Sequence, residues 1–193
     1  MACWGLRMIA DPNRGVSDYR ARLRREGPSS LRTARFELEP ICRAHAPLLF
    51  GVLSDPALHE YTGGVPPATV EALALRFSVW EKCQSPDGSE LWLNWSICER
   101  EHGERVGYVQ ATVAQDHVDF AWVIGIAWQR RGYASEAAQA VKEWIAGLGA
   151  TNFRACIKPE HAASQRVAER LGLRRSGAWI DGEEVWAVRG ARP

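Results

Sequence analysis

A strand that leads through a glycine turn into a helix constrains this chain more than any other feature. Val118 to Ile124 is an apolar segment of strand length, and Gln129-Arg130-Arg131-Gly132-Tyr133-Ala134 follows it. Beyond Gly132, apolar residues recur at helical spacing as far as Leu148. A helix that begins at such a turn directs its unpaired backbone N–H groups, and the positive end of its dipole, at one point. The pattern predicts an anion-binding turn in a domain of mixed strands and helices.

The residues of this turn suit a phosphate group. Gly132 lets a ligand approach the backbone closely, and Ala134 keeps the first helical turn narrow. Arg130 and Arg131 can neutralise further negative charge. Taken alone, however, the turn favours a plainer interpretation, a solvent-exposed Arg-Arg-Gly turn that binds nothing.

Length and charge limit the remaining possibilities. The chain has 193 residues, of which 46% are hydrophobic and 24% charged, so we expect one globular domain with a short appendage. Its 24 basic and 23 acidic residues leave a formal charge of +1, which disfavours a general attraction to nucleic acid. No segment is apolar over the length that a membrane span needs, and the N-terminal segment lacks the apolar centre of a signal peptide. We therefore expect a cytoplasmic protein with no membrane partner.

The cysteines are widely spaced, and no two of them form a Cys-x-x-Cys pair. They are Cys3, Cys42, Cys83, Cys98 and Cys156. This spacing predicts neither a zinc site nor a disulfide framework. We expect reduced thiols that mainly pack against other side chains, and no metal.

Residues 1–30 differ in composition from the rest of the chain. The segment is rich in arginine, and Pro12 and the Gly27-Pro28 pair interrupt helical structure. It is predicted to be a flexible basic arm with one helical turn around Tyr19 to Leu23, followed by a single domain over residues 31–193. An RNA-binding arm is the alternative, which the lack of interleaved aromatic residues disfavours.

Hydrophobic periodicity gives the order of elements in the domain as β-α-α-β-β-β-α-β-α-β-β. The expected strands cover residues 31–40, 91–97, 106–113, 118–124 and 153–157, with two more around the Asp181-Gly182 turn. The expected helices cover residues 46–53, 70–80 with Thr69 as the N-cap, 134–148 and 161–171. The strands between residues 91 and 124 follow one another through short polar turns, which predicts an antiparallel meander.

Two later segments give the glycine turn its context. Pro159-Glu160-His161-Ala162-Ala163-Ser164 is followed by Val167-Ala168-Glu169-Arg170-Leu171-Gly172-Leu173. Together with the Gln-x-x-Gly-x-Ala turn, these segments resemble the GNAT acetyltransferase superfamily. Within it the chain looks most similar to the ribosomal-protein N-terminal acetyltransferases of the RimJ and RimL type, which Leu31-x-Thr-x-Arg-Phe-x-Leu also resembles. The likeness covers about residues 31–189.

The resemblance implies a fold and an acetyl donor. The fold is α+β with three layers: a mixed, mostly antiparallel sheet that splays open at the strand over residues 118–124, with helices on both faces. Acetyl-CoA, the acetyl donor, lies in the cleft, and its pantetheine arm pairs with the backbone of Trp122, Val123 and Ile124. The implied pyrophosphate-binding residues are Gln129, Arg130, Arg131, Gly132, Tyr133, Ala134 and Ser135. His161 and Ser164 are further implied contacts to the donor.

Three departures from the family pattern change the expectations. Ile126 stands where the family usually has proline, so we expect a bulge at Gly125 to splay the strands. His161 stands where asparagine is common and either donates one hydrogen bond to the pantetheine or is a partly exposed residue at a helix start. Many relatives protonate the leaving thiolate with a tyrosine at the position of Ala168, so that mechanism is excluded here.

Acetyl transfer also needs a proton for the leaving sulfur and a base for the amine. By resemblance Ser164 serves the sulfur, although a serine there also fits a helix cap. Glu183 is our choice of base. Glu184, Glu90, Asp119 and a water chain are alternatives, and a solvated surface role explains each carboxylate as well.

The resemblance predicts an N-acetyltransferase that acts on a primary amine. The acceptor site is expected between residues 58–67, the strand at 91–97 and the last hairpin. If Trp92 and Trp122 both face this site, they suit a small apolar amine or a protein N-terminus. The alternatives are an aminoglycoside-type antibiotic acetyltransferase, which would need a cluster of acidic residues, and a non-catalytic CoA-binding domain. We expect a monomer or a homodimer.

Overall fold

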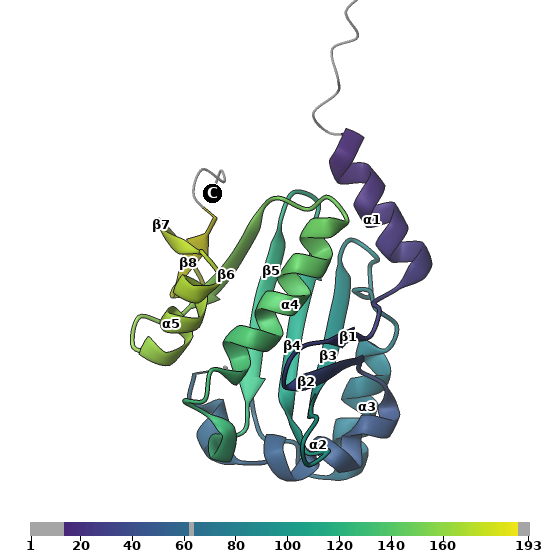
Figure 1. Cartoon of the computed structure of the whole chain (residues 1–193), viewed down its shortest axis with the longest axis vertical. Coiled ribbons are helices and arrows are strands. Elements are labelled where there is room, and N and C mark those ends of the chain that lie inside the picture. Colours follow the sequence, from purple (N-terminus) through teal and green to yellow (C-terminus); the bar gives the residue numbers. More distant parts are fainter. Residues whose placement is uncertain (1–13, 62–63, 189–193) are drawn as a thin grey trace, which may run out of the picture.

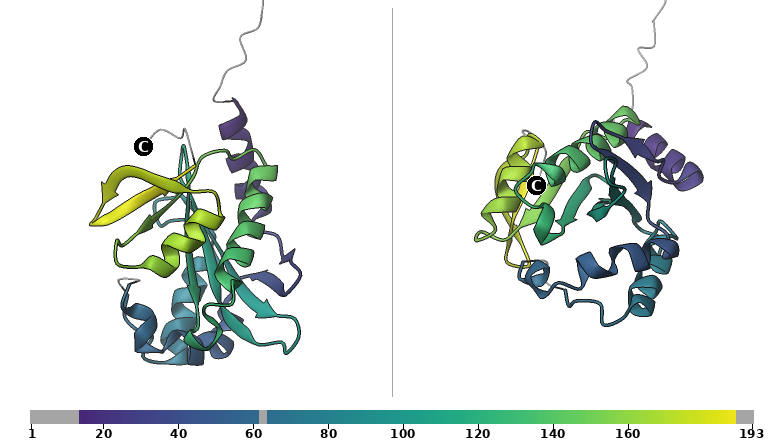
Figure 2. Two further views of the ribbon diagram at one scale, coloured as in Figure 1. Left: turned by 60° about the vertical axis from the view of Figure 1, so that its left-hand side comes forward. Right: turned by 60° about the horizontal axis from the view of Figure 1, so that its bottom comes forward.

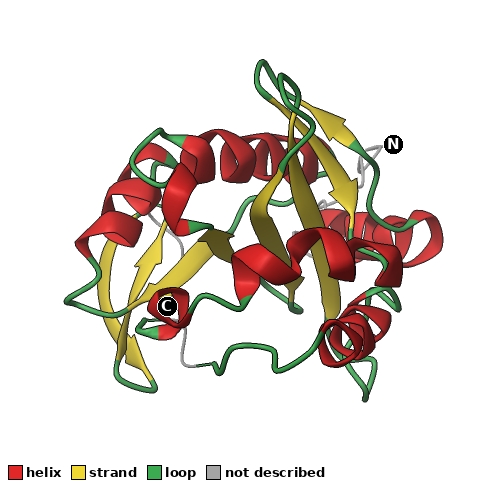
Figure 3. Cartoon of the chain, turned by 90° about the horizontal axis from the view of Figure 1, so that it is seen from below, coloured by secondary structure: helices red, strands yellow, loops and turns green. Residues whose placement is uncertain are grey.

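The computed structural model describes residues 14–61 and 64–188, which form an eight-stranded sheet with helices on both faces (Figures 1 and 3). The strands are β1 (Leu31–Arg32), β2 (Phe36–Pro40), β3 (Leu91–Glu99), β4 (Arg105–Val113), β5 (Val118–Ile124), β6 (Phe153–Ile157), β7 (Arg174–Ile180) and β8 (Glu183–Ala187). Their order across the sheet is β1-β2-β3-β4-β5-β6-β8-β7. Only the β5–β6 pair is parallel among these neighbours. The expected mixed, mostly antiparallel sheet is confirmed.

The helices divide between the two faces of the sheet (Figure 2). They are α1 (Arg14–Glu26), α2 (Ala46–Leu53), α3 (Val70–Trp80), α4 (Tyr133–Gly147) and α5 (Ala162–Arg170), with short 3-10 turns η1 (Arg43–His45), η2 (Pro56–His59) and η3 (Ile126–Trp128). One core cluster joins α1, α4 and α5 to the sheet, and the other joins α2 to α3. This division confirms the three-layer α+β architecture.

The layers are held by apolar side chains that are fully removed from water. On the α4 face Phe36, Trp95 and Ile145 are 0% exposed, and on the other face Leu49 and Phe77 are also 0% exposed. Burial of each such side chain stabilises the fold by about 1.5–3 kcal/mol. Among the described residues, no helix is long and apolar enough to cross a membrane.

Most predicted elements appear at their expected positions, but the first strand is divided. Residues 31–40 form the antiparallel pair β1 and β2, in which Leu31 lies opposite Leu38. Thr33 closes the turn between them, since its N–H donates to Phe36 O and its hydroxyl accepts from Phe36 N, both at 2.9 Å. The prediction of one continuous strand is wrong because apolar alternation is the same on both sides of a tight turn.

The structure also corrects the expectation of a flexible arm for residues 14–26. This segment forms α1, which buries Tyr19 and Leu23 in the main core at 3% and 2% exposure. Arg20 and Arg24 donate to the carbonyls of Ser89 and Gly88 at 2.8 and 2.7 Å. Residues 1–13 lie outside the described residues, and the domain division at residue 30 stays a prediction.

The four cysteines in the described part of the chain, Cys42, Cys83, Cys98 and Cys156, are free thiols. Each is half-buried. This agrees with the expectation of reduced, packing thiols; Cys3 lies outside the described residues.

Candidate active site

The sheet opens between β5 and β6, as the resemblance implies. Their parallel pairing consists of Val118 with Phe153 and Asp119 with Arg154. Beyond Asp119, β5 continues to Ile124 with β4 as its ladder partner. Figure 1 shows the two strands side by side at the top of the sheet and diverging towards the bottom. The backbone of residues 120–124 therefore presents an edge that an extended ligand can pair with.

The splaying does not come from a bulge at Gly125. The β4–β5 register runs without a shift, and Gly125 N–H adds one more bond to Val106 O at 2.8 Å. A Cβ at Gly125 would lie 2.7 Å from Val52 Cγ1, so glycine serves a close approach to α2 here. The prediction of a bulge at Gly125 is wrong. The sheet splays because β6 separates from β5 after only two paired positions.

The glycine turn lies at the open end of this edge. Gly132 is in the left-handed region with φ 77°, and Arg130 shares it with φ 62°. The first helical bond runs from Glu136 N–H to Gly132 O at 3.1 Å. The N–H groups of residues 133–135 consequently have no backbone acceptor among the described residues, and they are the donors that the sequence assigns to a pyrophosphate.

The predicted side chains of the turn divide into exposed and anchored ones. Arg130 and Arg131 are exposed. Gln129 Nε2 donates to Ile124 O at 3.0 Å, which fixes the turn to the end of β5. Tyr133 is buried with its hydroxyl donating to Glu99 at 3.1 Å, so it offers a ligand only its backbone. Ser135 Oγ accepts from Arg170 Nη1 at 3.4 Å and joins α4 to α5.

The β1–β2 turn braces the start of α4 through Arg35 and Glu136. Arg35 Nε lies 2.6 Å from Glu136 Oε2, and Arg35 Nη1 donates to Arg131 O at 2.9 Å. Glu136 Oε1 accepts from Thr33 Oγ1 at 2.6 Å. Burial raises the pKa of Glu136, but hydrogen bonds from Thr33 and Arg35 outweigh it and lower the pKa overall. Arg35 belongs to the segment that resembles the family, but nothing in the sequence near Arg35 predicts this contact with Glu136.

Trp122 and Ser164 meet across the opening of the sheet. Trp122 lies on β5, Ser164 lies in the first turn of α5, and the indole Nε1–H donates to Ser164 Oγ at 3.2 Å. His161 Nε2 lies 3.5 Å from the same oxygen. Three of the predicted donor-binding residues are therefore brought together, one from the splayed strand and two from the start of α5.

His161 is covered by Tyr61, a residue that lies in the expected acceptor segment. The two rings stack with centroids 4.4 Å apart and planes 9° apart. Burial lowers the pKa of His161, which favours the neutral imidazole. Tyr61 lies within residues 58–67, the segment expected at the acceptor site, and its aromatic ring is the one sequence signal for this contact.

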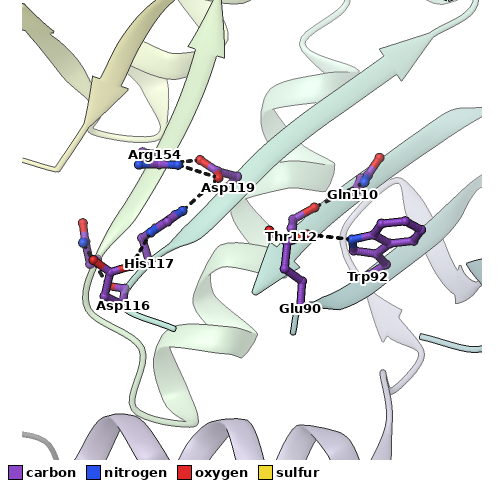
Figure 4. Close-up of polar contacts among 9 residues, drawn as sticks. Glu90, Trp92, Gln110, Thr112, Asp116, His117, Asp119 and Arg154 are labelled. Atoms are coloured by element: carbon purple, nitrogen blue, oxygen red, sulfur yellow. Dashed lines mark hydrogen bonds and ion pairs between the residues drawn. The ribbon is translucent and has the colours of Figure 1, made fainter. Parts of the chain in front are cut away.

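The candidate bases differ in what they contact. Glu184 is paired with Arg175 at 2.5 Å. Figure 4 shows the other two contacts: Asp119 accepts two hydrogen bonds from Arg154, and Glu90 accepts from the Trp92 indole at 3.0 Å. Glu183 has no ion pair within the described residues. Burial, opposed in part by Lys158, raises the pKa of Glu183. Of the four carboxylates, Glu183 is the one left open to accept a proton.

The two tryptophans do not face the same side of the sheet. Trp92 lies opposite Thr112, which lies opposite Asp119, while Trp122 lies opposite Val109 in another row. Because side chains alternate along a strand, Asp119 and Trp122 point to opposite faces. Figure 4 shows Trp92 beside Glu90 and Thr112, in a group separate from Asp119 and its partners Arg154 and His117. The hypothesis that Trp92 and Trp122 together line the acceptor site is therefore wrong.

Comparisons with known proteins agree with this geometry. The model of the acetyltransferase (GNAT) domain family matches residues 35–174. The uncharacterised N-acetyltransferase YnaD of Bacillus subtilis (strain 168) is 40% identical over 62 residues, which are 31% of this chain and 35% of that protein. The match thus spans about a third of that relative.

Solved structures share the fold. A GNAT-family acetyltransferase from Bacillus anthracis superposes with a TM-score of 0.67 at 21% identity, over 83% of this chain and 98% of that one. A protein assigned as a ribosomal-protein-serine acetyltransferase from Vibrio cholerae superposes with a TM-score of 0.66 at 19% identity, over 83% and 97%.

Proposed function

Because the chain belongs to the GNAT acetyltransferase domain family and is an acyltransferase, we propose that it transfers the acetyl group of acetyl-CoA directly to a primary amine. The contact of Trp122 with Ser164 carries the proposal. It holds a hydroxyl group at the opening between β5 and β6, on the same side as the free edge of β5 that suits the donor. Direct transfer needs a hydroxyl or other acid there, since Ala168 excludes the tyrosine used by many relatives.

The donor site would be built largely from backbone. The edge of residues 122–124 would pair with the pantetheine arm, and the amides of residues 133–135 would hold the pyrophosphate. Exposed Arg130 and Arg131 would add charge-assisted contacts. These groups are already in place without a ligand, so binding would order few side chains and lose little entropy.

Ser164 would give the proton to the leaving sulfur. An indole N–H is a donor only, so Ser164 Oγ accepts from Trp122 and keeps its own hydrogen for another partner. In the free protein, neutral His161 is the acceptor in reach, at 3.5 Å. A thiolate would be a stronger acceptor than this distant imidazole, because its charge strengthens the hydrogen bond.

Glu183 would accept the proton of the incoming amine. Its raised pKa brings it closer to neutral pH, where a carboxylate is a more effective base. It starts β8 directly after the Asp181-Gly182 turn, so it lies at the hairpin that the resemblance places at the acceptor site. Glu184, Asp119 and Glu90 are each held by another side chain.

The acceptor would be a protein N-terminus of the kind used by the RimJ and RimL branch, or a small amine. The stacked rings of Tyr61 and His161 support this class, because they offer an apolar wall rather than a cluster of carboxylates for an aminoglycoside. The branch, the cytoplasmic location and the monomeric or dimeric state stay predictions.

The test is to mix the protein with acetyl-CoA and a panel of peptides, small amines and aminoglycosides, following free thiol release and the mass of each acceptor. We expect thiol release matched by acetylation of a peptide or a small amine. Acetylation of aminoglycosides alone would overturn the acceptor class. Acetyl-CoA binding without thiol release across the panel would favour the non-catalytic CoA-binding domain.

A further inference from the structure

A second group of reactive side chains lies at the start of α2, formed by Cys42, His45 and Glu39. Cys42 precedes η1, His45 ends it, and Glu39 lies near the end of β2. Cys42 Sγ is 3.4 Å from His45 Nδ1, and His45 Nε2 is 3.1 Å from Glu39 Oε2. A thiol, an imidazole and a carboxylate are thus connected in series, as in sites where a base activates a nucleophile and an acid orients the base.

The hydrogen bonds fix which nitrogen of His45 carries the lone pair. Cys42 N–H donates to Nδ1 at 3.1 Å, so Nδ1 is the acceptor and Nε2–H donates to Glu39. The same Nδ1 faces the Cys42 thiol. Glu39 also accepts from Arg105 at 2.7 Å, and although burial raises the pKa of Glu39, the hydrogen bonds from Arg105 and His45 lower this pKa overall. An ionised Glu39 stabilises the imidazolium that forms when His45 takes a proton.

The thiol lies at a concavity and not in the packed core. The concavity has a volume of about 700 Å³ and lies between the start of α2 and helix α3. Its lining includes Cys42 and Arg43 from one side and Val70 and Ala74 of α3 from the other. The concavity is shallow and widely open, so a small organic molecule can reach the thiol from solvent. His45, in contrast, is only 7% exposed, so a small molecule can meet the thiol while the base stays shielded from water.

We propose that Cys42 is a site of thiol–disulfide exchange with small organic disulfides, with His45 as the base. The Cys42 thiol passes its proton to His45 Nδ1, and the thiolate attacks one sulfur of the disulfide. A new bond forms between Cys42 Sγ and that sulfur, and the bond within the disulfide breaks. The Cys42 sulfur is oxidised, the departing sulfur is reduced to a thiolate, and this thiolate takes the proton back from imidazolium. This inference does not rest on the acetyl-transfer proposal.

The other described thiols serve as internal references. Burial raises the pKa of Cys83, Cys98 and Cys156, which lowers the thiolate fraction of each at neutral pH. None of the three has a histidine within hydrogen-bond reach among the described residues. If His45 had a purely structural role, in which its ring only accepts from the backbone N–H of Cys42, Cys42 would react with disulfides no faster than these three thiols.

The experiment measures the exchange rate of each cysteine in the full chain with dithiodipyridine, a neutral disulfide. Mass spectrometry of peptides from quenched time points assigns a rate to each thiol. We expect Cys42 to react at least about 10-fold faster than Cys83, Cys98 and Cys156, and Cys42→Ser to remove the fast phase without altering the others. The decisive variant is His45→Gln, whose amide oxygen keeps an acceptor for the Cys42 N–H but is not a base.

In His45→Gln we expect Cys42 to react about 10-fold or more slowly, while the melting temperature stays close to that of the parent protein. An unchanged Cys42 exchange rate in a folded His45→Gln protein would overturn the proposal. His45 would then serve only as a hydrogen-bond acceptor for the backbone N–H of Cys42. A Cys42 rate no higher than that of the buried thiols in the parent protein would overturn it as well. If His45→Gln does not fold, His45→Asn with the same two measurements replaces it.

Discussion

The Trp122 indole can only donate a hydrogen bond to Ser164, so the Ser164 hydroxyl hydrogen stays available for another acceptor. Replacement by alanine removes the hydroxyl but leaves Trp122 and the α5 backbone in place. We expect Ser164→Ala to lower kcat for acetyl transfer by about 100-fold, the range of a lost general acid, with a smaller change in KM for acetyl-CoA. Steady-state kinetics with an identified acceptor measures this.

Ser78→Ala is the matched control, because Ser78 donates to a backbone carbonyl on α3 and lies on an element remote from the opening. It should keep the parent kcat. An unchanged kcat in Ser164→Ala would remove this residue from the mechanism.

Glu183 and Glu184 are adjacent residues, and we expect their replacement by glutamine to have opposite effects on stability and on activity. The raised pKa of Glu183 means that the fold disfavours its charged form, so its ionisation reduces stability as pH rises through that pKa. Glu183→Gln should therefore raise stability slightly at neutral pH, yet lower kcat/KM and remove the acid limb of its pH profile. Glu184→Gln loses the charge pair with Arg175 and should lose stability while keeping activity. Thermal melts and pH–rate profiles of both variants check this.

The reverse result, full activity in Glu183→Gln with an intact acid limb, would assign the base to water or to another group. A loss of activity in both variants at equal loss of stability would point to damage of the hairpin and not to a base.

Single residues of the site could be named from the sequence, but their contacts could not. Trp122, His161 and Ser164 were each expected near the donor, and the structure joins them. The Arg35–Glu136 pair connects residues 101 positions apart and the Tyr61–His161 stack joins two separate loops, so neither leaves a local pattern. The prediction for Trp92 is wrong because the sequence shows how side chains alternate within one strand but not the register between strands, which decides whether Trp92 and Trp122 share a face.

In the proposed function donor binding depends on helix α4, and the first turn of this helix contains the acidic residue Glu136. Arg35 Nε lies 2.6 Å from the Glu136 carboxylate, and without the Arg35 guanidinium that charge would keep only hydrogen bonds from Thr33 and the residue 35 backbone, with no cation to neutralise it near the proposed phosphate site. We expect Arg35→Gln to weaken CoA binding by about 10-fold, roughly the effect of one lost charge-assisted contact. Titration calorimetry with CoA gives the dissociation constant.

The double variant Arg35→Gln with Glu136→Gln tests the cause. Because it removes the unpaired charge, it should recover most of the lost affinity. Equal affinity in Arg35→Gln and the parent protein would show that the brace has no role in binding.

Helix α1 shows where reading the sequence by composition fails. The many arginines of residues 14–26 predict a flexible, solvent-exposed arm. Two apolar residues four positions apart, Tyr19 and Leu23, instead pack this helix against the core. We expect Leu23→Ala, at a site only 2% exposed, to lower the free energy of unfolding by about 2–5 kcal/mol. Urea denaturation measures this, with the exposed Arg22→Ala as the control; a loss under about 0.5 kcal/mol would mean that α1 is not part of the cooperative fold.

The elements that the sequence predicted well have strong local signals. Helices α2 and α3 and strands β5 and β6 have the expected bounds, because caps, prolines and apolar periodicity mark them. The turn within residues 31–40 was missed because it depends on the hydroxyl of Thr33, which is held in place by Glu136 on a distant helix. Tertiary contacts of this kind decide boundaries that periodicity does not.

At the scale of the whole molecule, a donor bound at the proposed site would couple the two halves of the splayed sheet, since the strand edge and the turn lie on one side of the opening and α5 lies on the other. A ligand that binds only the folded protein stabilises it, by about 2.7 kcal/mol at 100 times its dissociation constant. For a chain of this size that corresponds to a rise in melting temperature of about 5–10 °C. We expect acetyl-CoA to produce this rise in the parent protein.

Gly132→Glu should abolish the rise, because its side chain adds bulk and negative charge where phosphate is expected. Any side chain at φ 77° is strained by about 1 kcal/mol, so Gly132→Ala is needed as the control for strain alone. A Cβ there would meet Arg35 Nη2 at 3.6 Å, an ordinary contact, so the alanine fits. Gly132→Ala should melt lower than the parent protein without ligand but keep most of the acetyl-CoA shift. An equal shift in Gly132→Glu and Gly132→Ala would exclude phosphate binding at this turn.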